Sequence, residues 1–198
     1  MSINQIPQVI RDKFEVHEWK HAIAILNTDF SDEWKDILDL LTALSIPISW
    51  IMSPGGRKSK IAEFVDDFLC GQRGWVEKKF DTQVVVDGIP TDSPTHKIDC
   101  YKNGVAIELE WNNKDPFFDR DLNNFRLLFD LRAISVGVII TRTDELQDIF
   151  NRLGKGDSYG ASTTHMSKLI PRIDGGGGAG CPILVFGIKP ECVEEVRQ

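Results

Sequence analysis

Three acidic residues lie close together in a segment that has the pattern of a β-hairpin. Asp99 precedes the dipeptide Asn103-Gly104, and Glu108 and Glu110 follow it. Asn-Gly is the strongest short-range signal for a two-residue turn. If this dipeptide forms the tip, Asp99 lies directly opposite Glu108 on the neighbouring strand. We therefore expect two carboxylates to face each other across the hairpin.

The two faces of this hairpin differ in chemistry. Side chains alternate along a strand, so Glu110 shares the face of Glu108. Like charges on directly opposed residues, about 4.5 to 5.5 Å apart, repel each other, so three carboxylates on one face need a positive partner. The opposite face is expected to be apolar and to carry Ile98, Cys100, Ile107 and Leu109.

A divalent cation is the natural positive partner for such a face. Mg²⁺ prefers hard oxygen ligands and commonly uses one or two carboxylates together with water and substrate phosphate. A bound metal lowers the pKa of an attacking water and neutralises charge on phosphorus oxygens. The acids therefore predict metal-dependent hydrolysis of a phosphodiester. The alternative is an exposed strand face whose acids only keep the sheet edge soluble.

Helices that would support the hairpin are indicated by apolar residues at helical spacing. Ser31 is a candidate N-cap for a helix that runs to about residue 45, and Ser59 is a candidate cap for a second helix. A third, strongly amphipathic helix is expected after Pro116 and runs to about Ile134. A short helix is expected over residues 144–153.

Strands are indicated by short apolar runs at residues 21–26, 136–141 and 182–188. Residues 88–94 contain a glycine and two prolines, and we expect them to form a loop. The mixture of helices and strands predicts an α/β fold with a central sheet. We expect one domain over residues 1–198.

Composition restricts the classes of protein that fit. The formal net charge of -7 argues against an indiscriminate DNA coat, although a local basic cleft is compatible with it. The four scattered cysteines lack zinc-ligand spacing and are expected to be reduced thiols. No apolar run approaches the roughly 20 residues of a membrane span, and the first residues do not resemble a secretory signal. We therefore expect a cytoplasmic protein without a membrane partner.

The spacing of the acids resembles the metal-binding motif of PD-(D/E)XK nucleases. Eight residues separate Asp99 from Glu108, and one residue separates Glu108 from Glu110, which stands where that family most often has Lys. This departure resembles the BamHI variant of the motif. The surrounding chain is similar to the BglII and BstYI group of type II restriction endonucleases, which carry Gln at this position. The similarity covers most of the chain, including the helix around Trp34 and the run at residues 182–188.

The resemblance implies a restriction-endonuclease-like fold, in which helices flank a central mixed sheet. It implies that Asp99 and Glu108 hold one or two Mg²⁺ ions, for which Mn²⁺ can substitute, with the backbone carbonyl of Leu109 as a further ligand. Glu110 would orient or deprotonate the nucleophilic water. A carboxylate cannot supply the positive charge of Lys, and a second metal ion could fill that deficit. Glu63 would be an accessory polar residue; the alternative is a solvated surface acid.

The resemblance also implies a homodimer that cuts double-stranded DNA at a palindrome containing GATC. A cognate DNA methyltransferase would belong to the same restriction-modification system without binding the enzyme directly. Phosphate contacts are expected from the basic loop, and base contacts from a polar segment and a nearby arginine. The residues concerned are Arg57, Lys58 and Lys60 in the loop, and Ser162, Thr163, Thr164, His165 and Arg172 in the recognition region.

Three alternatives remain open at this point. The basic loop and the polar segment could be an ordinary solvated loop and connector. The chain could be a DNA-binding protein that kept the fold but lost cleavage, because Glu110 departs from the motif. It could also be an unrelated metal-binding or protein-binding α/β domain.

Overall fold

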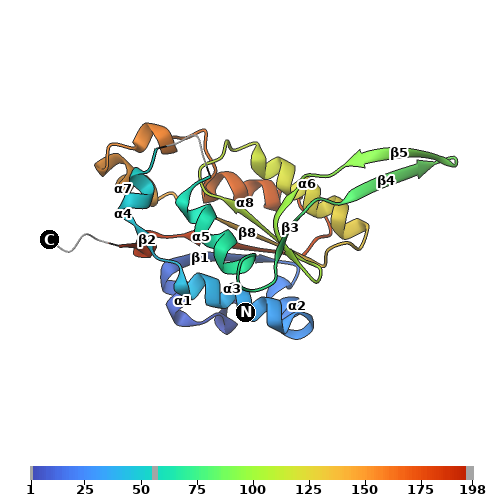
Figure 1. The fold of residues 1–198 in the computed structure, drawn as a ribbon, viewed down its shortest axis with the longest axis horizontal. Helices are drawn as coiled ribbons and strands as arrows, with labels where there is room; N and C mark the ends of the chain where they lie inside the picture. Colours follow the sequence, from blue (N-terminus) through green and yellow to red (C-terminus); the bar gives the residue numbers. More distant parts are fainter. Residues whose placement is uncertain (1, 55–57, 195–198) are drawn as a thin grey trace.

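A six-stranded mixed sheet forms the centre of the computed structural model, which describes residues 2–54 and 58–194 (Figure 1). The strand order is β1-β9-β8-β7-β6-β3. Strands β7, β8 and β9 run parallel, whereas β1, β6 and β3 pair antiparallel with their neighbours. The strands are β1 (Phe14–Trp19), β3 (Val76–Lys78), β6 (Ile98–Lys102), β7 (Val105–Glu110), β8 (Val136–Arg142) and β9 (Ile183–Ile188).

Helices cover both faces of this sheet, which confirms the expected α/β fold with a central mixed sheet. On one face lie α2 (Ala22–Asp29), α3 (Ser31–Ala43) and α5 (Lys60–Leu69). On the other face lie α6 (Phe117–Asp130) and α8 (Met166–Asp174). The short elements are η1 (Ser2–Gln5), α1 (Gln8–Lys13), β2 (Ile46–Pro47), α4 (Ile48–Met52), α7 (Leu146–Arg152), η2 (Gly156–Tyr159), η3 (Pro190–Cys192) and β10 (Val193–Glu194).

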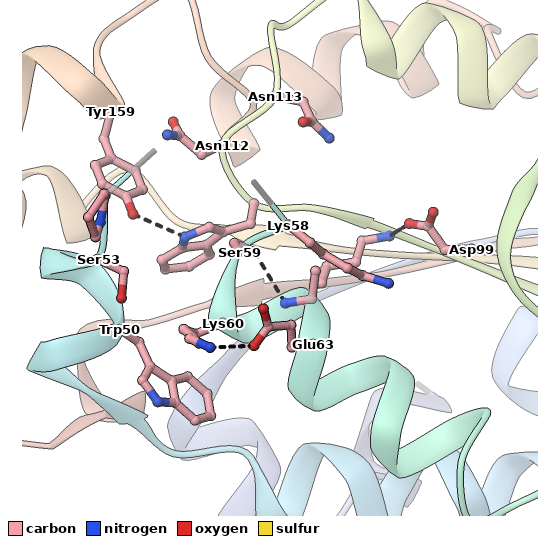
Figure 2. Close-up of a pocket in the computed structure, with 14 residues that line it drawn as sticks. Trp50, Ser53, Lys58, Ser59, Lys60, Glu63, Asp99, Asn112, Asn113 and Tyr159 are labelled. Carbon is pink, nitrogen blue, oxygen red and sulfur yellow. Dashed lines mark hydrogen bonds and ion pairs between the residues drawn. The ribbon is translucent and has the colours of Figure 1, made fainter. Parts of the chain in front are cut away.

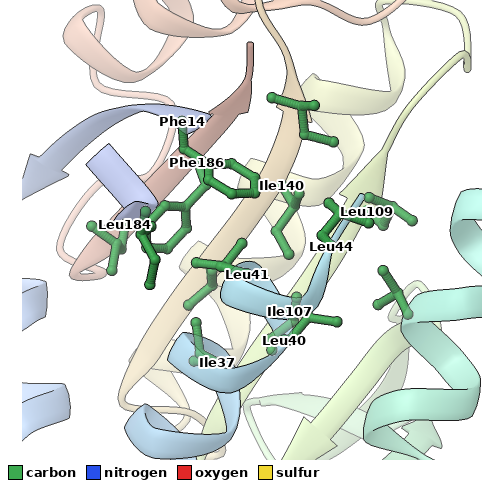
Figure 3. Close-up of a cluster of buried hydrophobic side chains, with 14 of the residues drawn as sticks. Phe14, Ile37, Leu40, Leu41, Leu44, Ile107, Leu109, Ile140, Leu184 and Phe186 are labelled. Carbon is green, nitrogen blue, oxygen red and sulfur yellow. The ribbon is translucent and has the colours of Figure 1, made fainter. Parts of the chain in front are cut away.

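The larger apolar cluster lies between the sheet and α3. Figure 3 shows Leu40, Leu41 and Leu44 against side chains of the central strands, among them Ile107 and Ile140. All five side chains are buried, and complete burial of a large aliphatic side chain contributes about 1.5–3 kcal/mol. The hairpin strand β7 is therefore held firmly from this side.

The predicted helices at residues 31–45, after Ser59, after Pro116 and at 144–153 are confirmed as α3, α5, α6 and α7. The Ser59 hydroxyl accepts a hydrogen bond from the backbone N–H of Ala62 at 3.2 Å, as expected of an N-cap. The expectation for Ser31 was wrong, because Ser31 is already the first helical residue and the cap position belongs to Phe30. None of the helices within the described ranges is long and apolar enough to cross a membrane.

The expected strand at residues 21–26 is wrong, because residues 22–26 belong to helix α2 and His21 is its N-cap. A short apolar run cannot by itself be distinguished from a buried helix. Lys20 and His21 have φ of 55° and 60°, which turns the chain sharply after β1. The Glu18 carboxylate then accepts a hydrogen bond from the N–H of Ile23 at 2.9 Å and satisfies a donor of the first turn.

The expected loop at residues 88–94 is also wrong, because it forms strand β5 (Ile89–Pro94). This strand pairs with β4 (Asp81–Val86) in a hairpin that projects from the rest of the protein (Figure 1). Asp87 and Gly88, with φ of 51° and 81°, form its turn. Asp-Gly is a strong hairpin signal, and it outweighs the prolines because a two-stranded ribbon has edges on which proline is tolerated.

Candidate active site

The acidic hairpin is β6 and β7, and its turn is the predicted one. Asn103 and Gly104 have φ of 47° and 93°, the left-handed conformations that a two-residue turn requires. The Asn103 amide also donates to the Glu33 carboxylate on α3 at 2.8 Å. The backbone register pairs Lys102 with Val105, Tyr101 with Ala106 and Cys100 with Ile107, as expected for this turn.

Asp99 and Glu108 lie next to the last backbone pair between β6 and β7, and the side chain of each contacts the backbone of the other strand. The backbone N–H of Asp99 donates to Glu108 Oε2 at 3.3 Å, and the N–H of Leu109 donates to Asp99 Oδ2 at 3.0 Å. The recorded backbone pairing ends one pair earlier, at Cys100 and Ile107. Asp99 and Glu108 are therefore neighbours as predicted, but carboxylate-to-backbone bonds join them.

Strand β6 carries one extra residue beside Asp99. Its register with β3 moves from Val76–Tyr101 to Lys78–Ile98, which is two residues on β3 and three on β6. Such a bulge reverses the alternation of side chains. Ile98 consequently packs on the α6 side of the sheet, not with Cys100 as expected. The predicted uniform apolar face is thus interrupted at Ile98.

A cavity of about 750 Å³ lies beside the hairpin on the α5 side (Figure 2). Asp99 and Leu109 stand in its wall, whereas Glu108 and Glu110 point to the opposite side of β7. The three carboxylates therefore do not share one open face. The cavity is lined by Trp50, Ser53, Pro54, Lys58, Ser59, Lys60, Ala62, Glu63, Asp99, Leu109, Trp111, Asn112, Asn113 and Tyr159.

Glu108 is completely buried. Its Oε1 atom has no hydrogen-bond partner within the part of the chain that the structure describes. Burial, with the carboxylates of Asp121 and Asp99 nearby, raises the pKa of Glu108 well above its usual value. Burial also raises the pKa of Asp99, and the bond from Leu109 offsets this in part. A buried carboxylate with an unpartnered oxygen is costly unless something positive joins it.

Glu110 is almost completely buried, with 1% of its surface exposed. Its Oε2 atom accepts from the Asn113 amide at 2.8 Å, and its Oε1 atom accepts from Arg120 Nη2 at 3.3 Å. Burial and the neighbouring Asp121 carboxyl raise the pKa of Glu110 to about 9. Without a further cation, these surroundings favour the protonated form of this carboxyl group at neutral pH.

Helix α6 contributes two charged residues that the sequence analysis missed. Asp121 is fully buried, and Arg120 forms ion pairs with both Asp121 and Glu110. A signal was present in the sequence, because Asp121 occupies the inward stripe of the helix with Leu122, Phe125 and Leu128. A carboxylate in such a stripe indicates a paired or functional acid.

The predicted phosphate-binding loop lies partly at the cavity. Lys58 and Lys60 line it and form ion pairs with Asp66 and Glu63, the latter at 2.6 Å between Nζ and Oε2. Arg57 lies outside the described residues. Glu63, predicted as an accessory residue, also lines the cavity (Figure 2). These positions are compatible with phosphate contacts, which stay a prediction.

The predicted recognition segment is held more tightly than an open reading surface would be. Thr164 and His165 are buried, and His165 Nδ1 lies 2.8 Å from the Asp144 carboxylate. The Thr163 hydroxyl accepts from the buried guanidinium of Arg142 at 2.9 Å, whereas Ser162 is exposed. Arg172 forms an ion pair with Asp119 at 2.9 Å. Base recognition by these residues stays a prediction, and the burial of Thr164 and His165 counts against their part in it.

No three His, Cys, Asp or Glu side chains in residues 2–54 and 58–194 form a group arranged to hold a metal ion. This does not conflict with the Mg²⁺ expectation, because Mg²⁺ is commonly held by one or two carboxylates with water and phosphate. The donor chemistry fits, since Asp99 and Glu108 offer hard oxygen atoms and Glu108 Oε1 has no described partner.

Comparison with models of known protein families gives a match over most of the chain. A family model described as restriction endonuclease BglII/BglIII matches residues 14–188, which is most of the chain. No curated protein matches the chain in a sequence search. The matched range runs from the first residue of β1 to the last residue of β9 and includes the whole hairpin.

Proposed function

The chain belongs to the BglII/BglIII restriction endonuclease family, and on this basis we propose that it is a type II, Mg²⁺-dependent restriction endonuclease. It hydrolyses phosphodiester bonds of double-stranded DNA at a short palindromic site, for which we propose a GATC core. The contact that supports this proposal in atomic terms is the one between Asp99 and Glu108. It holds two acids with hard oxygen atoms next to each other on the hairpin, and one of them, Asp99, stands in the wall of a cavity that is also lined by lysines.

Asp99 and Glu108 are the proposed Mg²⁺ ligands, with the backbone carbonyl of Leu109 as a third. The unpartnered Oε1 atom of Glu108 and the raised pKa of both acids support this role, because each indicates a carboxylate in need of positive charge. When bound, Mg²⁺ neutralises charge on the scissile phosphate and lowers the pKa of the attacking water. We propose one or two ions, and we expect Mn²⁺ to substitute.

Glu110 is the proposed residue that orients the water and accepts its proton. Only the ionised carboxylate can accept a proton, and the pKa of about 9 favours the protonated form in the metal-free protein. A cation beside the carboxylates favours ionisation. Metal binding would therefore convert Glu110 into the form that its role requires.

Double-stranded DNA would lie across the cavity with its phosphates near Lys58 and Lys60. Glu63, at the same wall, would act as an accessory acid. We propose a homodimer, because a twofold protein can cut one strand of a palindrome with each subunit. We also propose a methyltransferase that protects the same site in the host without binding this protein.

The experiment that tests this function is cleavage of long DNA by the purified protein. We expect discrete fragments with Mg²⁺ or Mn²⁺ and none with EDTA, and sequencing the fragment ends would identify the site. The Asp99→Asn variant should give no fragments under the same conditions. An absence of discrete fragments from many long substrates, at any metal concentration tested, would refute the enzyme.

A second candidate is a DNA-binding protein of the same fold that does not cut. The burial of both Glu108 and Glu110, together with the substitution of the motif lysine by Glu110, favours it. This candidate predicts specific binding of a palindromic duplex with no cleavage in Mg²⁺ or Mn²⁺. The same cleavage assay, combined with a binding assay on the same DNA, separates the two candidates.

A further inference from the structure

We propose that Arg120 is a positioning residue for DNA cleavage, because its guanidinium holds the Glu110 carboxylate and brings positive charge to it. This role rests on the proposed nuclease function. Here the charge would come from helix α6, outside the motif.

The geometry of Arg120 links the buried acids to the protein surface. Nη2 lies 3.3 Å from Glu110 Oε1, and Nη2 and Nε lie 2.8 and 2.9 Å from Asp121 Oδ1. The guanidinium carbon stands 4.1 Å from the centre of the Phe117 ring. Whereas Glu110 and Asp121 are at most 1% exposed, the Arg120 side chain is 31% exposed. One guanidinium therefore serves two buried carboxyl groups and remains accessible to solvent.

Asp121 fixes Arg120, and Arg120 in turn fixes Glu110. The two short contacts to Asp121 Oδ1 restrain the guanidinium more strongly than the 3.3 Å contact to Glu110 does. On its other side, Glu110 Oε2 is held by the Asn113 amide at 2.8 Å. Both oxygens of Glu110 are thus oriented, which is what a residue that aligns a nucleophilic water needs.

The charge balance of the cluster supports more than a packing role. Glu108, Glu110 and Asp121 are buried acids, and Glu108 Oε1 has no hydrogen-bond partner among the described residues. A purely structural ion pair would use one guanidinium for one carboxylate and leave few buried polar atoms unsatisfied. This cluster has three buried carboxyl groups and one arginine. The position of the Arg120 guanidinium therefore decides which carboxyl groups receive positive charge.

The test compares Arg120→Gln, Arg120→Lys and the control Arg126→Gln in single-turnover cleavage of the cognate DNA with Mg²⁺. Arg126 lies on the same helix, is exposed and contacts Asn123, not the acids. We expect Arg120→Gln to lower the cleavage rate roughly 100-fold, the usual cost of losing one donor at a reacting centre. Arg120→Lys should recover at least about a tenth of the wild-type rate, and DNA affinity measured in Ca²⁺ should change within a factor of about three.

A cycle with Glu110→Gln provides the second measurement. If Arg120 acts through Glu110, then Arg120→Gln should have almost no further effect on the rate in the Glu110→Gln background. Multiplicative losses, or a normal rate for folded Arg120→Gln, would overturn the role. If Arg120→Gln fails to fold, the double variant Arg120→Gln/Asp121→Asn replaces it in the same cycle. This double variant removes both charges of the Arg120–Asp121 ion pair.

The wild-type arm separates this inference from the proposed function. Wild-type protein that cuts no DNA refutes the nuclease and this role together. Wild-type protein that cuts DNA as fast as Arg120→Gln does refutes the role alone.

Discussion

The Glu108 carboxylate accepts a hydrogen bond from the backbone N–H of Asp99 at 3.3 Å across the hairpin. Asp99 in turn accepts from the N–H of Leu109, the residue that follows Glu108. The two acids are thus bonded into each other's strand at the end of the backbone ladder. Their relative position is set by the hairpin itself, so each should tolerate a neutral isosteric replacement structurally but not chemically.

Replacing Asp99 by Asn should abolish cleavage while leaving the fold intact. The Asn side-chain oxygen can still accept from Leu109, but it lacks the charge that a metal ligand needs. We expect the single-turnover rate to fall by roughly 1000-fold, the upper range for loss of one electrostatic contact, with the melting temperature nearly unchanged. Asp29→Asn, an exposed change at the end of α2, is the matched control. A cleaving Asp99→Asn protein would contradict the site assignment.

The stability of the metal-free protein should decrease with rising pH because of Glu110. Burial raises its folded-state pKa from 4.5 to about 9, so the folded protein holds this proton more tightly than the unfolded chain does. The contribution of Glu110 to the unfolding free energy is present in full below the pKa of the unfolded chain. It is lost as pH rises through the pKa of the folded protein. Denaturant unfolding in EDTA over this pH range should show a smaller decrease of the unfolding free energy for Glu110→Gln than for the wild-type protein.

The control for that experiment is Glu145→Gln, because Glu145 is exposed just before α7. Its unfolding free energy should follow the wild-type pH profile. Identical profiles for wild type and Glu110→Gln would mean that Glu110 keeps an ordinary affinity for its proton.

Asn103 should stabilise the hairpin in two separable ways. Asn103→Ala places an alanine at φ of 47° and removes the hydrogen bond to Glu33, so we expect a loss of about 2 kcal/mol. Asn103→Gly tolerates the left-handed conformation and removes only the hydrogen bond, so its loss should be about 1 kcal/mol. Equilibrium unfolding of both variants checks this order, and a more stable alanine variant would be inconsistent with it.

Gly137 should be intolerant of any side chain because α6 packs directly on β8 there. A Cβ atom at this position would lie 2.3 Å from the Phe125 ring. We expect Gly137→Ala to lower the unfolding free energy by about 1–3 kcal/mol through overpacking. Combination with Phe125→Leu should cost less than the sum of the two single changes, since the smaller side chain relieves the contact. Additive losses would place the origin of the effect elsewhere.

Several features of the site could be read from local sequence because local chemistry determines them. The turn at Asn103-Gly104 follows from the ease with which these residues adopt positive φ, and the cap at Ser59 follows from a hydroxyl beside free helix N–H groups. The spacing from Asp99 to Glu108 then brings the two acids together through the hairpin register. The turn, the helix cap and the hairpin register each involve only a few residues that are close in sequence. Because such short segments have few competing conformations, their structure follows from the local sequence.

Other features were decided only when distant segments packed together. Residues 21–26 became a helix because a turn after β1 and the Glu18 carboxylate favour one there. The extra residue in β6 depends on pairing with β3 and moves Ile98 to the other face.

The environment of the acids is likewise a product of tertiary structure. Helix α6 covers Glu108 and Glu110 and brings Arg120 and Asp121 near them. Burial and the Asp121 carboxylate raise the pKa of both glutamates, and Arg120 offsets this in part. The acidic residues and their spacing along the hairpin could therefore be predicted from the sequence. Their burial, charge state and positive partner were not, because desolvation and Coulomb energy depend on which remote atoms exclude water from the carboxylates.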